Sequence, residues 1–182
     1  MDWIWEQIAG LDFTTCLDAF GGTGAVAYRL KQASKAVTYN DLLRFNYYVG
    51  LALVENRNVR LDADEVDWLL TTHPDIEYPN FIQAHFHDIY FTDEENAWID
   101  RTFTNIRQLA DPYKFALAFF ALCQACIIKR PYNLFHRIRI SIFAWLKLIA
   151  RLETRQPGIA PLMNGFAFLL RKLIKPSLTT GR

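Results

Sequence analysis

Cysteine is scarce in this chain of 182 residues, which contains three cysteines in all. A small and odd number of cysteines argues against the disulfide framework of a secreted domain and favours a reducing, cytoplasmic location. The first residues lack the basic segment that opens a signal peptide, so export is not expected. The longest apolar run, residues 115–128, is interrupted by Gln124 and is shorter than the roughly 20 residues that span a bilayer. It is therefore expected to form a buried helix, and no membrane partner is predicted.

Acidic residues are almost absent from the second part of the chain. Residues 113–182 contain 12 Lys/Arg and 1 Asp/Glu, whereas residues 1–112 contain 8 Lys/Arg and 18 Asp/Glu. A basic half is typical of proteins that contact nucleic acid or an anionic membrane surface. The sequence also lacks internal repeats and low-complexity linkers, and its apolar content of 52% is enough for the core of one domain.

The apolar pattern of the first third alternates between strand and helix. Strands are expected at residues 15–20, which should be buried, and at residues 36–39; helices are expected at residues 3–8, 24–32 and 43–55. This order predicts a parallel sheet covered by helices. Residues 57–92 are expected to be less regular. Beyond them, a capping box of Thr92 and Glu95 begins one helix, and Asp111–Pro112 begins another that continues to about residue 128.

The segment CLDAFGGTGAVA, residues 16–27, has the layout of a nucleotide-type cofactor loop: a strand, a glycine turn and a helix. Gly22 and Gly24 allow the backbone to turn tightly and to approach a ligand. Asp41 lies 19 residues after Gly22, where an acid at the end of the second strand binds ribose hydroxyls. On spacing alone, Ala27 completes a dinucleotide fingerprint, so a nicotinamide-dependent oxidoreductase is an alternative.

The pattern D-x-F-x-G-x-G, residues 18–24, resembles motif I of the class I S-adenosylmethionine-dependent methyltransferases. With the later segments VTYND, AxxEN, DIYFTDEENAWID and KRPYNLFHR, it resembles the Dam-like adenine-specific DNA methyltransferases from about residue 3 to residue 137. The resemblance implies an α/β, Rossmann-like class I methyltransferase fold, incomplete here, with a mainly helical DNA-recognition segment. It also implies methyl transfer from S-adenosyl-L-methionine to adenine N6 in double-stranded DNA, in a solitary or a restriction-modification system with a cognate endonuclease encoded nearby.

The resemblance also implies two groups of site residues. The cofactor would be held by Asp18, Phe20, Gly22, Thr23, Gly24, Asn40 and Asp41. DNA would be contacted by Lys129, Arg130, Asn133, His136 and Arg137. The alternative for these last residues is a solvated helix end, because cations also favour helix C-termini.

The catalytic motif of that family, Asp/Asn-Pro-Pro-Tyr/Phe, does not occur in the sequence. Asp111-Pro112-Tyr113 contains one proline and is interpreted as a helix cap, so no catalytic residue is predicted and the chain by itself is expected to be inactive. A degenerate remnant that binds S-adenosylmethionine or DNA without catalysis is therefore a second hypothesis.

The residues after Arg137 depart from the family pattern. Codons shifted by one base can encode family-like segments at three places in this tail, including Phe-Gly-Asn-Lys-Ala-Thr-Trp over residues 152–158. We therefore expect residues 1–60 to form the N-terminal part of the cofactor domain and residues 61–137 a helical target-recognition segment. Residues 138–182 are expected to be an out-of-frame tail, which sequencing of the locus would test. An amphipathic membrane-surface tail is the alternative.

Three further patterns are interpreted as structural. Cys123 and Cys126 match C-x-x-C but lie in an apolar run, so buried core cysteines are favoured over a zinc site. His85 and His87 are expected on a half-exposed strand, with no third metal ligand in sight. The aromatic stripe of Tyr39, Phe45, Tyr47 and Tyr48 is expected to be mostly core, with one ring able to stack on the cofactor adenine. No metal site is predicted.

Overall fold

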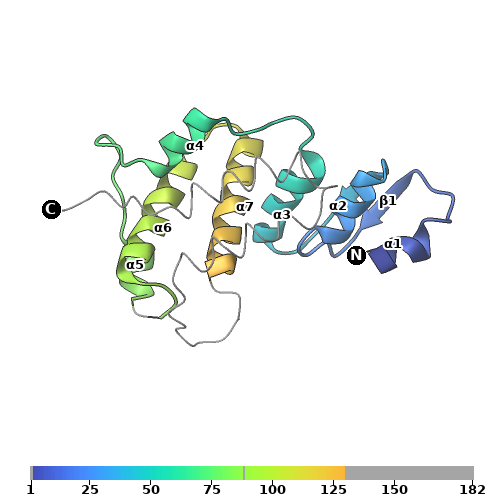
Figure 1. Cartoon of the computed structure of the whole chain (residues 1–182), viewed down its shortest axis with the longest axis horizontal. Coiled ribbons are helices and arrows are strands. Elements are labelled where there is room, and N and C mark those ends of the chain that lie inside the picture. Colours follow the sequence, from blue (N-terminus) through green and yellow to red (C-terminus); the bar gives the residue numbers. More distant parts are fainter. Residues whose placement is uncertain (1, 88, 130–182) are drawn as a thin grey trace, which may run out of the picture. The chain divides into compact units, whose positions relative to one another are not determined.

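The computed structural model describes residues 2–87 and 89–129, and this part of the chain divides into two compact units. The first unit consists of residues 1–60 and 110–120, and the second of residues 61–109 and the residues from 121 onward. The long helix α7 (Pro112–Lys129) contributes its first part to one unit and its remainder to the other. Helices predominate in the ribbon, as Figure 1 shows.

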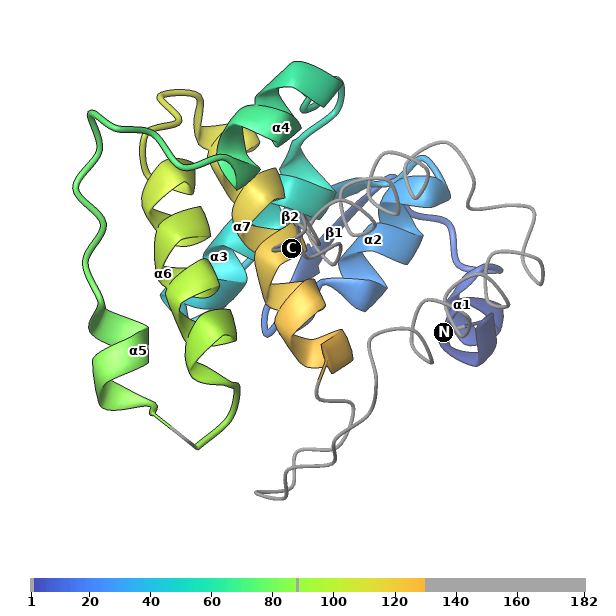
Figure 2. The same ribbon diagram turned by 60° about the vertical axis from the view of Figure 1, so that its left-hand side comes forward.

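The first unit contains a small parallel sheet. Strand β1 (Thr15–Asp18) pairs with β2 (Ala36–Tyr39) in a register that places Thr15 opposite Ala36, and helix α2 (Ala25–Gln32) connects the two strands. Helix α1 (Asp2–Ile8) precedes them. Figure 2 shows α2 beside the two strands. The β-α-β order predicted from the sequence is thus confirmed for these elements.

The expectation that the first strand is buried was wrong. Alternate residues of β1 are exposed, and Leu17 retains 65% of its surface. Among the described residues β1 pairs with β2 alone, so one edge of each strand is left without a hydrogen-bonded neighbour. The apolar side chain of Leu17 on β1 is therefore left largely uncovered by the described residues.

The helix expected at residues 43–55 is present but changes its geometry midway. Helix α3 (Arg44–Gly50) continues into a π-helical turn, η1 (Leu51–Glu55), which ends where Asn56 N–H donates to the Leu51 carbonyl at 3.0 Å. The wider turn leaves carbonyls without their usual partners. The ammonium group of Lys31 binds two carbonyls at this end, those of Leu53 and Asn56.

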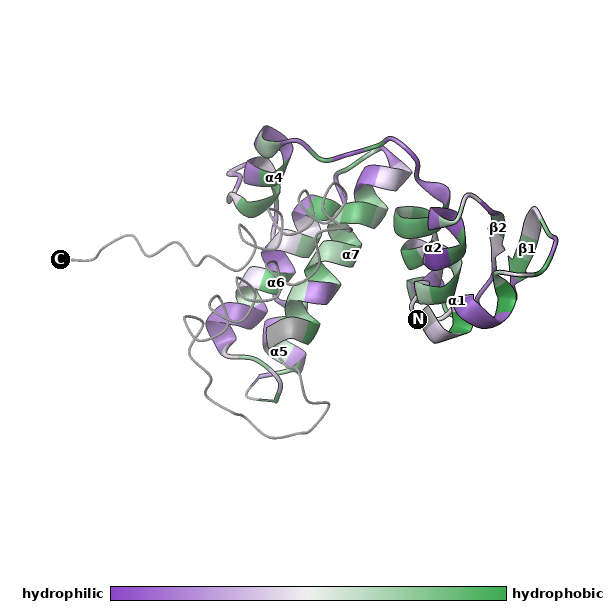
Figure 3. Ribbon diagram, turned by 45° about the vertical axis from the view of Figure 1, so that its right-hand side comes forward, coloured by the Kyte–Doolittle hydropathy of each residue, from purple (hydrophilic) through white to green (hydrophobic). Residues whose placement is uncertain are grey.

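The core of the first unit lies between α3, η1 and the beginning of α7. Leu51, Ala52 and Ala116 are buried there, with Tyr48 and Leu117 packed against them. The Tyr48 ring lies 4.9 Å from the ring of Phe115, centroid to centroid. Apolar residues recur along α7, which Figure 3 shows in green. Among the described residues, no helix is long and apolar enough to cross a membrane.

Helix α7 begins as the sequence predicted. The Asp111 carboxylate accepts the backbone N–H groups of Tyr113, at 2.8 Å, and Lys114, at 3.1 Å. Pro112 occupies the first helical position, where its missing N–H leaves no intrahelical bond unmade. Asp111-Pro112-Tyr113 therefore acts as a helix cap.

The second unit is helical in its described part. Its elements are α4 (Ala63–Leu70), α5 (Phe81–His85), α6 (Asp93–Ile106) and the later part of α7. Helix α6 begins at the predicted capping box, in which Thr92 N–H donates to the Glu95 carboxylate at 3.1 Å and Glu95 N–H to the Thr92 hydroxyl at 3.3 Å. Helix α4 lies in a region expected to be irregular and also begins at a capping box, formed by Asp62 and Glu65.

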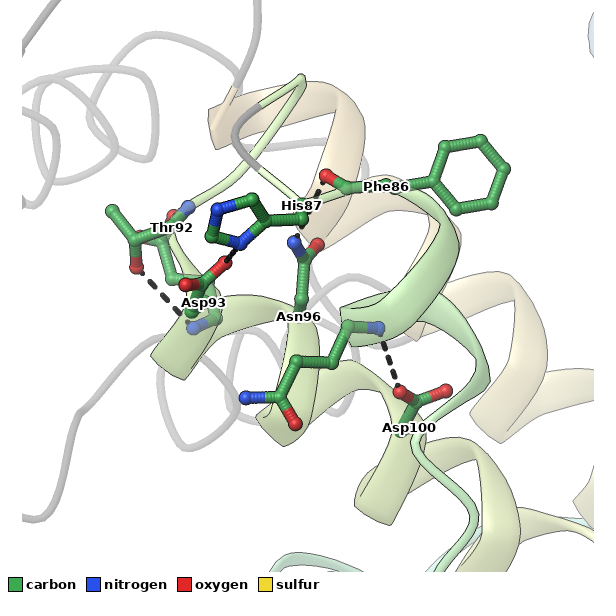
Figure 4. A network of polar contacts seen from close by, with 8 residues as sticks. Phe86, His87, Thr92, Asp93, Asn96 and Asp100 are labelled. Carbon is green, nitrogen blue, oxygen red and sulfur yellow. Dashed lines mark hydrogen bonds and ion pairs between the residues drawn. The ribbon is translucent and has the colours of Figure 1, made fainter.

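His85 and His87 were expected on a half-exposed strand, and this was wrong. His85 closes the short helix α5, whose first N–H groups are accepted by a carboxylate from another helix. Asp100 of α6, which is labelled in Figure 4, accepts Ile82 N–H at 2.9 Å and Gln83 N–H at 3.0 Å. In the same network, the side-chain amide of Asn96 donates to the Phe86 carbonyl at 3.2 Å. Tertiary contacts with α6 therefore select a helix in this segment.

Candidate cofactor-binding loop

The loop of residues 19–24 connects the end of β1 to the beginning of α2. Gly24 N–H donates to the Gly21 carbonyl at 2.8 Å, which closes a tight turn, and Gly24 then caps α2. Gly22 and Gly24 have φ angles of 51° and 72°, in the left-handed region that a side chain disfavours. These two positions therefore require glycine on backbone grounds.

The residue that follows β2 holds the first part of this loop. The Asn40 carbonyl accepts Gly21 N–H at 2.9 Å, and the Asn40 side-chain amide donates to the Ala19 carbonyl, also at 2.9 Å. Asn40 N–H in turn donates to the Asp18 carbonyl at 2.9 Å. Asn40, which was predicted to bind the cofactor, therefore orders the loop through its backbone and its side chain together.

Two further residues from the end of β2 bind the peptide groups on either side of Gly22. Gly22 N–H donates to the Asp41 carboxylate at 2.8 Å, and the Tyr39 hydroxyl donates to the Gly22 carbonyl at 2.7 Å. The 19-residue spacing that predicted a cofactor acid thus has a direct structural counterpart, because it brings Asp41 to the glycine turn. Three consecutive residues, Tyr39, Asn40 and Asp41, all contact this loop.

Hydrogen bonds keep the Asp41 carboxylate ionised. The N–H of Leu43, the side chain of Asn46 and the N–H of Gly22 bind its charged form, and together they lower the pKa of Asp41 below its ordinary value. Burial has the opposite effect on the neighbouring phenol: it raises the pKa of Tyr39 to about 12, with smaller contributions from Asp41 and Asp18. Tyr39 therefore keeps its phenolic proton at neutral pH and can donate it in a hydrogen bond.

The surface of the loop offers one unused acceptor and one exposed ring. The Asp18 Oδ2 atom is buried and has no hydrogen-bond partner in the described part of the chain. Buried polar atoms in proteins are usually paired, so this oxygen is available to a donor group of a ligand. Phe20 is 92% exposed, and Thr23 is also exposed. The cofactor residues predicted from the sequence therefore lie at the end of β1, on this loop or directly after β2.

Tyr39 was expected to belong to an aromatic stripe that is mostly core, and no role at the glycine turn was predicted for it. Its ring instead lies between Gly21 and Gly50: a Cβ atom at Gly21 would overlap it, and one at Gly50 would lie 2.5 Å from Tyr39 Cδ1. The sequence signal that could have placed Tyr39 at the loop is its position directly before Asn40 and Asp41. The other members of the stripe differ in burial: Phe45 and Tyr47 are exposed, whereas Tyr48 packs against the core.

A cavity of about 730 Å³ runs along β2 in the first unit. Its lining includes all four residues of β2, the turn η1 and the loop of residues 56–59. Tyr39 lines this cavity and also contacts the glycine loop, so one residue belongs to both features. No sequence pattern indicated this cavity.

The residues predicted to contact DNA fall at the limit of the described structure. Lys129 is the last residue of α7, and Arg130, Asn133, His136 and Arg137 lie outside the described residues, as does the tail at 138–182. Within residues 2–87 and 89–129, no three His, Cys, Asp or Glu side chains are grouped so that they could hold a metal ion. Burial raises the pKa of Cys123 to about 12 and that of Cys126 to about 11, as expected of core thiols.

Comparison with known proteins identifies the family. Residues 1–130 match the family model described as D12 class N6 adenine-specific DNA methyltransferase. The chain is 34% identical over 134 residues to the type II methyltransferase M2.HphI of Haemophilus parahaemolyticus; these residues make up 74% of this chain and 39% of that relative. No solved structure matches the chain. The resemblance inferred from the sequence motifs is confirmed, and the chain belongs to the D12 class of N6 adenine-specific DNA methyltransferases.

Proposed function

We propose that this chain is the S-adenosyl-L-methionine-binding part of a DNA adenine N6-methyltransferase with a Rossmann-like class I fold. The observation that carries the proposal is the glycine loop between β1 and α2, which three consecutive residues from the end of β2 hold in place. A strand, a glycine turn and a helix, with an acid at the end of the second strand, form the general layout of nucleotide-type cofactor sites. Family membership over residues 1–130 selects a methyl donor.

The loop residues suit the chemical groups of this cofactor. S-adenosyl-L-methionine supplies the methyl group and presents an ammonium group, a carboxylate, a ribose and an adenine ring. The unpartnered Asp18 Oδ2 suits the ammonium group, and the exposed Phe20 ring suits an apolar contact. The Asp41 carboxylate, which lies just after β2 and accepts Gly22 N–H and Leu43 N–H, is the proposed partner of the ribose. Gly22, Thr23, Gly24 and Asn40 form the remaining wall.

We assign no catalytic residue within these 182 residues. The Asp/Asn-Pro-Pro-Tyr/Phe motif is absent from them, and the one similar segment caps α7. The proposal for this chain alone is therefore cofactor binding without methyl transfer, which the hypothesis of a degenerate binding remnant also predicts. Nothing in the comparisons supports a nicotinamide-dependent oxidoreductase.

Double-stranded DNA is the proposed macromolecular partner, with residues 61–137 as the target-recognition segment. Lys129, Arg130, Asn133, His136 and Arg137 are the proposed contacts. A cation that contacts a phosphate adds nearly one to the slope of log affinity against log salt concentration. Replacing Lys129 or Arg130 by alanine should lower that slope by about one in fluorescence anisotropy with duplex DNA. An unchanged slope would assign these residues to a solvated helix end instead.

Titration calorimetry of the full chain with S-adenosyl-L-methionine tests the proposal. Phe20→Ala is the most informative variant, because a side chain that is 92% exposed contributes little to folding. We expect unchanged thermal stability and roughly tenfold weaker binding, the effect of losing one apolar contact of about 1.4 kcal/mol. Ile127→Ala, which shortens an exposed side chain of the second unit, is the matched control. Binding of NAD with no response to S-adenosyl-L-methionine would refute the proposal.

A further inference from the structure

We propose that Tyr39 is a positioning residue, which sets the backbone of the glycine loop in the geometry that receives the cofactor. This inference rests on the proposed function of the loop. It concerns a residue that touches the loop from the side of β2, through its hydroxyl group and through one edge of its ring, while the other edge of the ring lies against Gly50 of α3. Tyr39 acts on the ligand through Gly22.

The hydroxyl group fixes the peptide that follows Gly22. Tyr39 donates to the Gly22 carbonyl at 2.7 Å, while the Asp41 carboxylate accepts Gly22 N–H at 2.8 Å. Both backbone polar groups of one glycine are thus held by side chains from the end of β2. Because glycine has no side chain to restrict its φ and ψ angles, these two bonds supply the restriction that the residue lacks. The raised pKa of Tyr39 keeps the donated proton in place.

The ring fixes the position of the loop relative to α3 and η1. Gly21 and Gly50 have no positive φ angle, so their backbone conformations are open to any residue. The Tyr39 ring occupies the volume that their side chains would need: a Cβ atom on Gly21 would lie 2.5 Å from Tyr39 Cδ2, and one on Gly50 would lie 2.5 Å from Cδ1. Glycine at both positions is therefore explained by the ring.

A residue that only filled the core would affect stability alone. For a positioning residue, a substitution that keeps the packing of the side chain but removes its contact with the loop must also change the affinity for the ligand. Tyr39→Phe makes that separation, because it keeps the ring between Gly21 and Gly50 and removes the donor to the Gly22 carbonyl. Tyr28→Phe is the matched control: Tyr28 lies on α2, is partly buried, and its hydroxyl makes no hydrogen bond to the described residues.

The first measurement is the dissociation constant for S-adenosyl-L-methionine, determined with the full chain well below its melting temperature. Loss of one hydrogen bond that orders the loop should weaken binding by about fivefold to tenfold in Tyr39→Phe. Tyr28→Phe should bind like the unaltered chain. Equal affinity of Tyr39→Phe and the unaltered chain would overturn the positioning role and leave the proposed function standing. Absence of binding by the unaltered chain would overturn the proposed function, and the inference with it.

The second measurement needs no cofactor. Gly21→Ala should lower the melting temperature of the full chain, because the new methyl group overlaps the Tyr39 ring. In a Tyr39→Val background the ring is gone, and the same Gly21→Ala change should cost little. The difference between the two penalties measures the coupling of the two residues. An equal penalty in both backgrounds would show that the ring does not determine the position of the loop.

Discussion

Replacing Asn105 with alanine is expected to destabilise the second unit far more than replacing its equally buried neighbour Thr102 with valine. Both residues lie on α6 and have no exposed surface. The amide of Asn105 donates to the carbonyls of Leu69, at 2.9 Å, and Thr71, at 2.8 Å. Its oxygen accepts the Tyr78 hydroxyl at 2.9 Å. One side chain therefore joins α6 to the end of α4 and to the loop that follows.

The magnitude follows from the three hydrogen bonds. Each contributes about 1 kcal/mol net, and each leaves a partner unpaired when Asn105 is truncated, so we expect a loss of about 3 kcal/mol in the free energy of unfolding. Part of this loss of free energy is the cost of leaving the Tyr78 hydroxyl without an acceptor for its proton. The same hydroxyl accepts His73 N–H at 2.9 Å. Thr102 is the opposite case, because its buried hydroxyl has no partner among the described residues.

Thr102→Val exchanges that hydroxyl for a methyl group of similar size, which removes an unpaired polar atom from the core. The expected change is within about 1 kcal/mol of zero or stabilising. Urea denaturation of both variants, followed by tryptophan fluorescence and circular dichroism, measures the two values. Similar losses in the two variants would refute the assignment of stability to the Asn105 bonds, since both substitutions would then report burial alone.

Three other predictions concern the loop and the core. Gly22→Ala should weaken cofactor binding more than Gly22→Asn does, because alanine disfavours a φ of 51° by about 1 kcal/mol or more and asparagine tolerates it; equal affinities in calorimetry would contradict this. The lowered pKa of Asp41 means that its bonds stabilise the fold above the unfolded pKa and are lost as pH falls through the folded pKa. Asp41→Asn should therefore be less stable than the unaltered chain at pH 7, and the difference should shrink below about pH 4. Cys123 and Cys126, with pKa values of about 12 and 11, should resist alkylation at pH 8 until the protein is denatured, as mass spectrometry would detect.

Local sequence signals predicted the elements that depend on local contacts. The capping box at Thr92 and the helix start at Asp111–Pro112 are both confirmed. Each depends on hydrogen bonds between residues that are at most three positions apart in the sequence. The capping box of Asp62 and Glu65 has the same form and was overlooked, so α4 was predictable in principle. The helix at residues 81–85 was not, because its N–H groups are accepted by Asp100, 17 and 18 residues further along the chain.

The same distinction applies to the site. The spacing of Gly22 and Asp41 located both residues correctly at one end of the sheet, where the structure joins them by a hydrogen bond. The position of the Tyr39 ring depends on α3, which the spacing of a glycine motif does not describe. An aromatic residue in a strand pattern is consistent with any packing partner, so its contact with Gly50 follows only from the fold.

The glycines in and around this loop are required for two separate reasons, which the sequence motif does not distinguish. Gly22 and Gly24 are required by left-handed backbone angles, so a side chain there strains the turn whatever surrounds it. Gly21 and Gly50 are required by the volume of one ring, so a side chain there is excluded only while that ring is present. The hydrogen bonds from Asn40 and Asp41 already join the loop to the end of β2. Packing of the Tyr39 ring against Gly21 and Gly50 adds a contact with β2 and α3, and under the proposed function this position would present Asp18 and Phe20 to the cofactor in a constant geometry.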